Sequence, residues 1–174
     1  MTVWQWLFDT QYGVINYVLV EAFGAQGMAG HSWLIEPLSF YFVATVIVVW
    51  MSVPFVTFTV YAGLLQVPSE ILEAAQLDGA IGWKRFWLVV VPMIAPVLSL
   101  VGLLQVIWDL RVFTQIFVLQ RAGGPTRDTH LLGTYIYSLS KEFSMAGAMA
   151  TIMLVLTLAV TALYIRRMLK QEEL

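Results

Sequence analysis

Aromatic rings and hydrogen-bonding side chains alternate over one short segment near the middle of the sequence. They stand at Gln105, Trp108, Asp109, Arg111 and Phe113. Sugar sites combine aromatic faces with paired hydrogen-bonding groups, and these residue types supply both. In a helix, positions 105, 108 and 109 share one face because they are three and four residues apart, whereas position 111 lies off it. The segment is therefore a candidate path for a polar solute.

A second group of residues offers chemistry for docking. It consists of one carboxylate, two small side chains, a glycine and a proline, namely Glu73, Ala74, Ala75, Gly79 and Pro92. Pro68-Ser69 predicts a helix start, and Gly79 predicts its end because glycine accepts a positive φ. A second short helix, from Ala80 to Leu88, leads to the proline. The small side chains allow the first helix to sit deep in a partner's cleft, where Glu73 can pair with a basic residue.

Other chemistry is excluded by what the sequence lacks. It has no cysteine, so it has no thiolate nucleophile, thiolate metal site or disulfide. It has no glycine-rich loop ending in Lys-Ser or Lys-Thr for ATP and no Gly-x-Ser-x-Gly elbow for a hydrolase. His31 and His130 are unpaired, and we expect them to be polar loop residues and not metal ligands. We predict no catalytic residue, metal or cofactor, and the dispersed Lys and Arg predict no nucleic-acid partner.

The elements that must position these residues are membrane-spanning helices. Apolar residues make up 60% of the sequence and charged residues 11%, against roughly a quarter charged in a soluble domain. Three runs contain no charge, namely Pro37–Ser69, Phe86–Trp108 and Phe143–Ile165. Each exceeds the roughly 20 apolar residues that a helix needs to cross a bilayer. We therefore predict an all-α integral membrane protein with transmembrane helices at 38–65, 88–108 and 143–165.

The distribution of basic residues predicts how these helices are oriented. Residues 1–83 carry only acidic charges, and Lys84 is the first basic residue. Because cytoplasmic loops collect Lys and Arg, we place residues 1–36 outside, the 69–88 loop inside and the C-terminal tail, with Arg166, Arg167 and Lys170, inside. A charge at the bilayer centre costs about 3 kcal/mol, so Asp109 and Arg111 should face a cavity. The alternative is that they lie at the interface within an aromatic belt.

The N-terminal aromatic residues and a proline in the first apolar run predict two further local features. Trp4, Trp6 and Phe8 predict that Met1–Phe8 is an interfacial segment or the end of a helix that begins upstream, with a frayed terminus as the alternative. Pro54 is predicted to kink the first transmembrane helix, with Thr57 and Thr59 satisfying the carbonyl it frees.

The segment from Glu73 to Pro92 resembles a family signature. The inner-membrane permeases of binding-protein-dependent ATP-binding-cassette (ABC) importers carry Glu-Ala-Ala, three residues, Gly, nine residues and Ile-x-Leu-Pro. This sequence has Glu73-Ala-Ala75, Gly79 and Val89-Val-Val91-Pro92 at that spacing. Carbohydrate permeases of the maltose, glycerol-phosphate and chitobiose type are also similar at Gly13–Asn16, Trp50–Phe55, Ala62–Pro68 and Phe113–Pro125. The last stretch departs from the usual Phe-Asp and Thr-x-Gly-Gly-Pro, which puts the identity of the sugar in doubt more than the class.

The resemblance implies a multi-pass permease subunit in a bacterial or archaeal inner membrane, surrounded by lipid. Residues 69–88 would be the cytoplasmic coupling loop, a helix–turn–helix that lies in a groove of the ATPase, and the helix that follows would line the path of a carbohydrate. The implied partners are a dimer of ABC ATPase subunits, a second permease subunit and an extracytoplasmic sugar-binding protein. The chain itself would perform no chemistry.

The resemblance also indicates a missing part and leaves two other functions open. Such permeases usually have more core crossings than the three predicted here, so we expect an N-terminally truncated chain that does not transport without upstream helices. One alternative is an importer permease for another solute, against which Gly123-Gly-Pro125 argues. The other is a non-transporting membrane assembly fragment.

Overall fold

The described chain is helical throughout and organised for a bilayer. The computed structural model describes residues 1–172, with side chains to Arg166. Within that part, three segments are long and apolar enough to cross a membrane, namely Pro37–Leu64, Ala95–Arg121 and Phe143–Arg166. The prediction of an all-α membrane protein with three spanning segments is confirmed.

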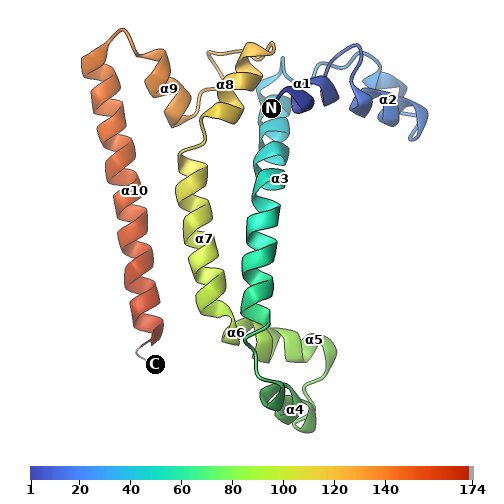
Figure 1. Ribbon diagram of the computed structural model, residues 1–174. Helices are drawn as coiled ribbons and strands as arrows, with labels where there is room; N and C mark the ends of the chain where they lie inside the picture. The colour runs from blue at the N-terminus through green and yellow to red at the C-terminus, as the bar shows by residue number, and fades with distance from the viewer. Residues whose placement is uncertain (173–174) are drawn as a thin grey trace. The chain divides into compact units, whose positions relative to one another are not determined.

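The helices divide between two compact units (Figure 1). Unit 1 contains residues 1–51 and 110–154, and unit 2 contains residues 52–109 and the chain from residue 155. Unit 1 holds α1 (Thr2–Leu7), α2 (Val14–Glu21), the 3₁₀ turn η1 (Gln26–Met28), α8 (Thr114–Arg121) and α9 (Leu132–Ser138). Unit 2 holds α4 (Ser69–Leu77), α5 (Gly82–Arg85), the π-helical segment η2 (Phe86–Val90), α6 (Val91–Met93) and most of α7 (Ala95–Leu110). The long helices α3 (Pro37–Leu64) and α10 (Phe143–Glu172) contribute residues to both units.

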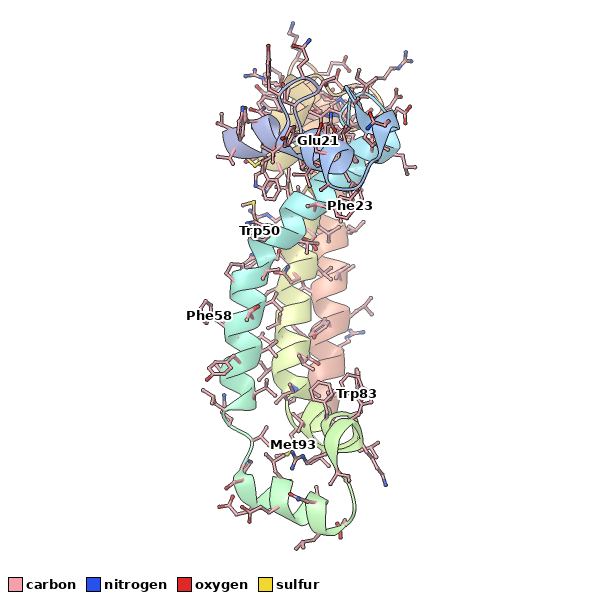
Figure 2. All side chains as sticks on the ribbon, turned by 90° about the vertical axis from the view of Figure 1, so that its right-hand side faces the viewer. Glu21, Phe23, Trp50, Phe58, Trp83 and Met93 are labelled. Carbon is pink, nitrogen blue, oxygen red and sulfur yellow. The ribbon has the colours of Figure 1, made fainter. Side chains whose placement is uncertain are left out.

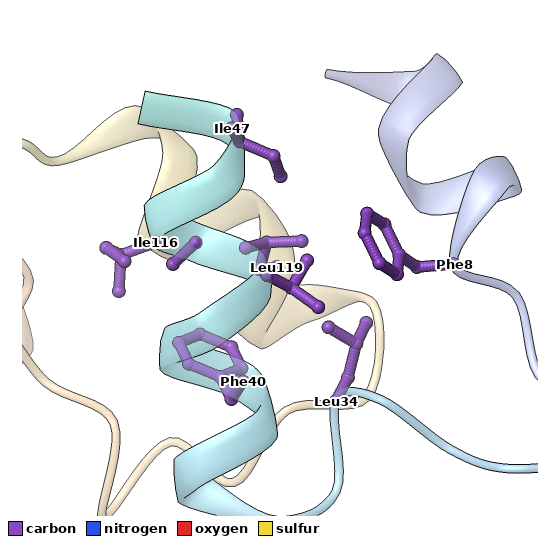
Figure 3. Close-up of a cluster of buried hydrophobic side chains, with 8 residues drawn as sticks. Phe8, Leu34, Phe40, Ile47, Ile116 and Leu119 are labelled. Carbon is purple, nitrogen blue, oxygen red and sulfur yellow. The ribbon is translucent and has the colours of Figure 1, made fainter. Parts of the chain in front are cut away.

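The core of unit 1 is formed where α3 and α8 meet the N-terminal segment (Figure 3). One stripe of α3 is buried there, at the three- and four-residue spacing of a helix face. The buried residues are Phe8, Leu34, Phe40, Val43, Ala44, Ile47, Ile116 and Leu119. Phe8 is only 5% exposed, and the Gln5 Nε2 donates to the Val118 carbonyl at 3.0 Å. The alternative of a frayed N-terminus is therefore wrong.

A buried asparagine joins α2 to the loop before α3. The Asn16 Nδ2 donates to the His31 carbonyl at 2.8 Å and to the Thr10 carbonyl at 3.3 Å. Its Oδ1 accepts from the Trp33 Nε1 at 2.6 Å. An unpaired buried polar group costs free energy, so Asn16 can be buried only when the loop is placed to make these bonds. The bonds in turn stabilise that conformation of the loop.

The turn between α1 and α2 depends on a close backbone approach. The Asp9 Oδ1 accepts from the backbone N–H groups of Gln11 and Tyr12, each at 2.8 Å. The bonds from Tyr12 and then Gln11 hold the pKa of Asp9 below its usual value, so their contribution is lost as the pH falls through that lowered pKa. A Cβ at Gly13 would lie 2.9 Å from both the Asp9 nitrogen and the Leu7 oxygen, so only glycine fits.

The start of the second apolar stretch differs from the predicted helix over 88–108. Helix α5 runs into the π segment η2, in which the Val91 N–H donates to the Phe86 carbonyl. Ile94 then separates α6 from α7. Pro92 and Pro96 explain the irregularity, because neither can donate the hydrogen bond that continues an α-helix. The regular helix therefore begins at Ala95.

Helix α3 continues through Pro54 without a break in its assignment. The Thr59 Oγ1 donates to the Phe55 carbonyl at 2.8 Å. Pro54, however, frees the carbonyl of Trp50. A threonine hydroxyl reaches only the preceding turn of its own helix, so the expectation that Thr57 or Thr59 satisfies that carbonyl was wrong.

Replacing Asn16 tests the polar core of unit 1. Asn16→Ala leaves the His31 carbonyl and the Trp33 Nε1 without their partner, and we expect it to lower the free energy of unfolding by about 2 kcal/mol. Thermal unfolding in detergent, followed by tryptophan fluorescence, measures this loss. Gln26→Ala, at an exposed position of η1, is the control. An unchanged unfolding temperature for Asn16→Ala would show that the network contributes nothing.

Candidate functional site

The segment between α3 and α7 forms two short helices joined at a glycine. Helix α4 ends in a Schellman motif, in which the Ala80 N–H donates to the Ala75 carbonyl at 2.8 Å and the Gly79 N–H to the Gln76 carbonyl at 3.1 Å. Gly79 has a φ of 77°, and no atom lies within 4 Å of where its Cβ would be. Backbone conformation, and not lack of space, therefore requires glycine here.

The three residues of the Glu-Ala-Ala stretch face different surroundings. Glu73 and Ala74 are exposed, and the Glu73 carboxylate has no hydrogen bond or ion pair within the described chain. Ala75 is only 9% exposed and is the buried residue of α4. Of the three, Glu73 and Ala74 are therefore the more accessible to a partner.

An aromatic cluster follows Gly79, and the sequence reasoning missed it (Figure 2). The ring of Trp83 lies 5.5 Å from that of Phe86 and 5.9 Å from that of Trp87, although Trp83 is 74% exposed. Lys84 and Arg85 lie between these rings in the sequence. The spacing of three and four residues beside two basic residues is the signal that could have identified the cluster. Such a combination is typical of the membrane–water interface.

Pro92 lies in the short helix α6 and is exposed. Its ring has no N–H to satisfy, which suits a position between a π segment and a new helix start. Together with Gly79, it bounds a segment whose backbone departs from regular α-helix.

The candidate solute residues are divided between the two units. Gln105, Trp108 and Asp109 belong to unit 2, whereas Arg111 and Phe113 belong to unit 1. The Gln105 Oε1 is buried and has no hydrogen-bond partner in the described chain. The Trp108 ring lies 4.9 Å from the ring of Phe55 on α3, and the Asp109 side chain is exposed. Helix α7 thus carries a buried acceptor at Gln105 and, three residues on, an aromatic ring at Trp108.

The other two candidate residues follow the end of α7. Arg111 is exposed, in the bend between α7 and α8. The Phe113 ring stacks on Phe117 at 5.2 Å and meets the edge of Tyr137 at 5.6 Å. Phe113 therefore packs against α8 and α9 and is partly exposed.

The loop at Gly123-Gly-Pro125 is held tightly against α3. A Cβ at Gly124 would lie 2.6 Å from one ring carbon of Phe40 and 2.8 Å from another. The buried Gln120 Nε2 donates to the Thr129 Oγ1 at 3.1 Å and so closes the loop. This sequence departs from the family pattern at Arg121, whose guanidinium carbon lies over the Phe117 ring, 4.6 Å from the ring centroid.

Two hollows and both histidines lie in unit 1, and one hollow is lined in part by Gly123. Two open hollows, of about 720 and 520 Å³, lie beside α1 and α2 and at the Phe8–Asp9 turn. His31 has its ring 4.9 Å from that of Trp33, and the His130 Nδ1 is buried without a partner. No group of three metal-ligating side chains occurs among the residues that the structure describes.

Comparison with known proteins identifies related sequences over nearly the whole chain. The family "Binding-protein-dependent transport system inner membrane component" matches residues 3–171. The permease protein DasB of the diacetylchitobiose uptake system of Streptomyces coelicolor is 42% identical, over 99% of this chain and 53% of its own length. The trehalose/maltose transport system permease protein MalF of Thermococcus litoralis is 33% identical, over 94% of this chain and 54% of its own. The inner membrane ABC transporter permease protein YcjO of Escherichia coli is 30% identical, over 91% and 52%. The chain thus spans about half the length of these relatives.

Replacing Gly124 tests the contact that holds the loop. In Gly124→Ala the added methyl overlaps the Phe40 ring, and overpacking of this kind costs about 1–3 kcal/mol. We expect a lower unfolding temperature in detergent. Gly27→Ala, where the added Cβ meets nothing within 4 Å, is the matched control. Equal unfolding temperatures for the two variants would contradict the close approach.

Proposed function

The chain belongs to the family of binding-protein-dependent transport system inner membrane components, and we propose that it is the part of a permease that couples an ATPase to carbohydrate import. Members of this family are membrane transport components and not enzymes. The apolar helices agree with a chain that crosses the membrane more than once. The observation that carries the proposal is the exposed, unpaired Glu73 carboxylate on a short helix that ends in a glycine turn.

The proposed coupling works by docking and displacement. Glu73 and Ala74 enter a groove of the ATPase, where the carboxylate meets a basic side chain. ATP-driven closure of the ATPase dimer then moves α4, and the membrane helices change from inward-open to outward-open. A change of this kind is an equilibrium between two states, biased by nucleotide at one end and by solute at the other.

The orientation that this requires places residues 69–88 on the cytoplasmic side. Lys84, the first basic residue of the sequence, lies in this segment, and basic residues tend to stay on the cytoplasmic side. The side chains of Arg167 and Lys170, on which the inside position of the tail also relied, lie outside the described side chains. The partners we propose are an ABC ATPase dimer, a second permease subunit and an external sugar-binding protein.

The proposed substrate class rests on the relatives and on α7. Two relatives are named for diacetylchitobiose and for trehalose and maltose, all of them sugars. In this chain, the unpaired Gln105 Oε1 and the ring of Trp108 supply an acceptor and an aromatic face on one side of α7. These groups support a path for a carbohydrate along that helix.

Two variants of the complete permease test the coupling. Glu73→Lys places a positive charge against the proposed basic groove, and a lost charge pair of this kind costs about 2–5 kcal/mol. Gly79→Pro forces a negative φ where the turn needs 77° and removes the donor to Gln76. We expect normal amounts in the membrane and at least tenfold lower sugar uptake in proteoliposomes. Glu70→Lys, with the same charge change on the same helix, is the control. Undiminished uptake by both variants would refute the proposal.

Gln105→Leu tests the proposed path. Removing an unpaired buried carbonyl costs no hydrogen bond, so we expect the unfolding temperature to stay the same or rise. If Gln105 meets the sugar, the KM for uptake rises about tenfold, as for the loss of one hydrogen bond of about 1.4 kcal/mol. An unchanged KM would remove Gln105 from the path.

A further inference from the structure

The two helices that flank the coupling segment touch at a glycine. Gly63 is buried in the last turn of α3, and Val97 lies in the first turn of α7. A Cβ at position 63 would lie 3.1 Å from the Val97 Cγ1, 3.2 Å from Cγ2 and 3.3 Å from Cβ. All three distances are shorter than ordinary van der Waals contact, so Val97 occupies the space that a side chain on residue 63 would need.

The backbone that joins these two helices through the coupling segment is irregular at several points. Gly79 and Gly82 both have positive φ, with values of 77° and 53°. The π segment η2 and the break at Ile94 follow before α7 begins. Breaks and π turns are the places where helices bend, so a displacement of α4 is absorbed there before it reaches α7 by way of the backbone.

We propose that Gly63 is a positioning residue for coupling, and that its contact with Val97 fixes the start of α7 to the end of α3. Because only four residues, 65–68, separate the end of α3 at Leu64 from the start of α4 at Ser69, movement of α4 acts on α3 first. The Gly63–Val97 contact then carries α7 with it, past the irregular segment. The proposal rests on the proposed transport function.

Side-chain size at positions 63 and 97 tests this directly. Gly63→Ala requires Val97 to move by a few tenths of an ångström, and Gly63→Val requires α3 and α7 to separate. The double variant Gly63→Val/Val97→Gly (the exchange variant) restores one valine and one glycine to the same contact, so the total side-chain volume there is unchanged. Gly102→Ala is the control on α7, since its Cβ would meet only the Tyr164 hydroxyl, at 3.9 Å.

The measurement is the number of sugars imported per ATP hydrolysed by the complete permease, with its ATPase and binding protein, in proteoliposomes. We expect this ratio to fall slightly in Gly63→Ala and at least fivefold in Gly63→Val, with ATP hydrolysis and membrane levels unchanged. The exchange variant should recover the ratio to within twofold, and Gly102→Ala should match the unsubstituted permease. An unchanged ratio in Gly63→Val overturns the proposal. So does a joint loss of hydrolysis and uptake that the exchange does not restore, since that indicates a structural role alone.

A second measurement separates this proposal from the proposed function. The sequence has no cysteine, so spin labels on cysteines introduced at Tyr61 and Leu100, both exposed, report the distance between α3 and α7. We expect one narrow distance distribution, a broader one in Gly63→Val and a narrow one again in the exchange variant. A permease without nucleotide-dependent uptake would refute the proposed function, whereas a distribution that Gly63→Val does not broaden would refute the contact.

Discussion

A backbone N–H or C=O group in hydrocarbon finds no water to bond, and this constraint organises the whole chain. Each apolar stretch must satisfy its own backbone, which it does as the long helices α3, α7 and α10. Because lipid accepts apolar side chains, these helices can leave most of their surface uncovered: α3 and α7 bury only a small part of their spans, and the described span of α10 buries none. The remaining structure follows from how the chain handles places where the helical hydrogen bonds stop.

In unit 1, side-chain hydrogen bonds stabilise the places where the helices end. Asn16 pairs with the loop at His31–Trp33, and Gln120 pairs with Thr129 beneath the Gly123-Gly-Pro125 loop. In both places a polar side chain is buried because its partners are buried with it. Sequence stretches that resemble a permease signature thus serve internal packing, and Gly124 is there because the ring of Phe40 leaves no room for a Cβ.

In unit 2, the segment between the helices α3 and α7 has an irregular backbone. Between Gly79 and Ala95 the chain passes through two glycines with positive φ, a π segment and a break at Ile94. Such a stretch is bendable, and so it suits a part that moves, but it transmits force badly. Direct contact between α3 and α7 at Gly63 compensates for that weakness. Ala75 faces inward while Glu73 remains free, so the same short helix both packs on its own unit and presents a charge outward.

The sequence alone was sufficient to predict three properties. The charge-free runs predicted an all-helical membrane protein, the spacing from Glu73 to Pro92 predicted its family, and Gly79 predicted the helix–glycine–helix turn. These properties depend on local hydrophobicity and on backbone conformation, which each residue type carries with it. The burial of Ala75, the π segment and the contact of Gly63 with Val97 were decided only by the tertiary structure. They depend on which side chains from distant positions meet, and no spacing along one helix specifies the surface against which that helix will pack.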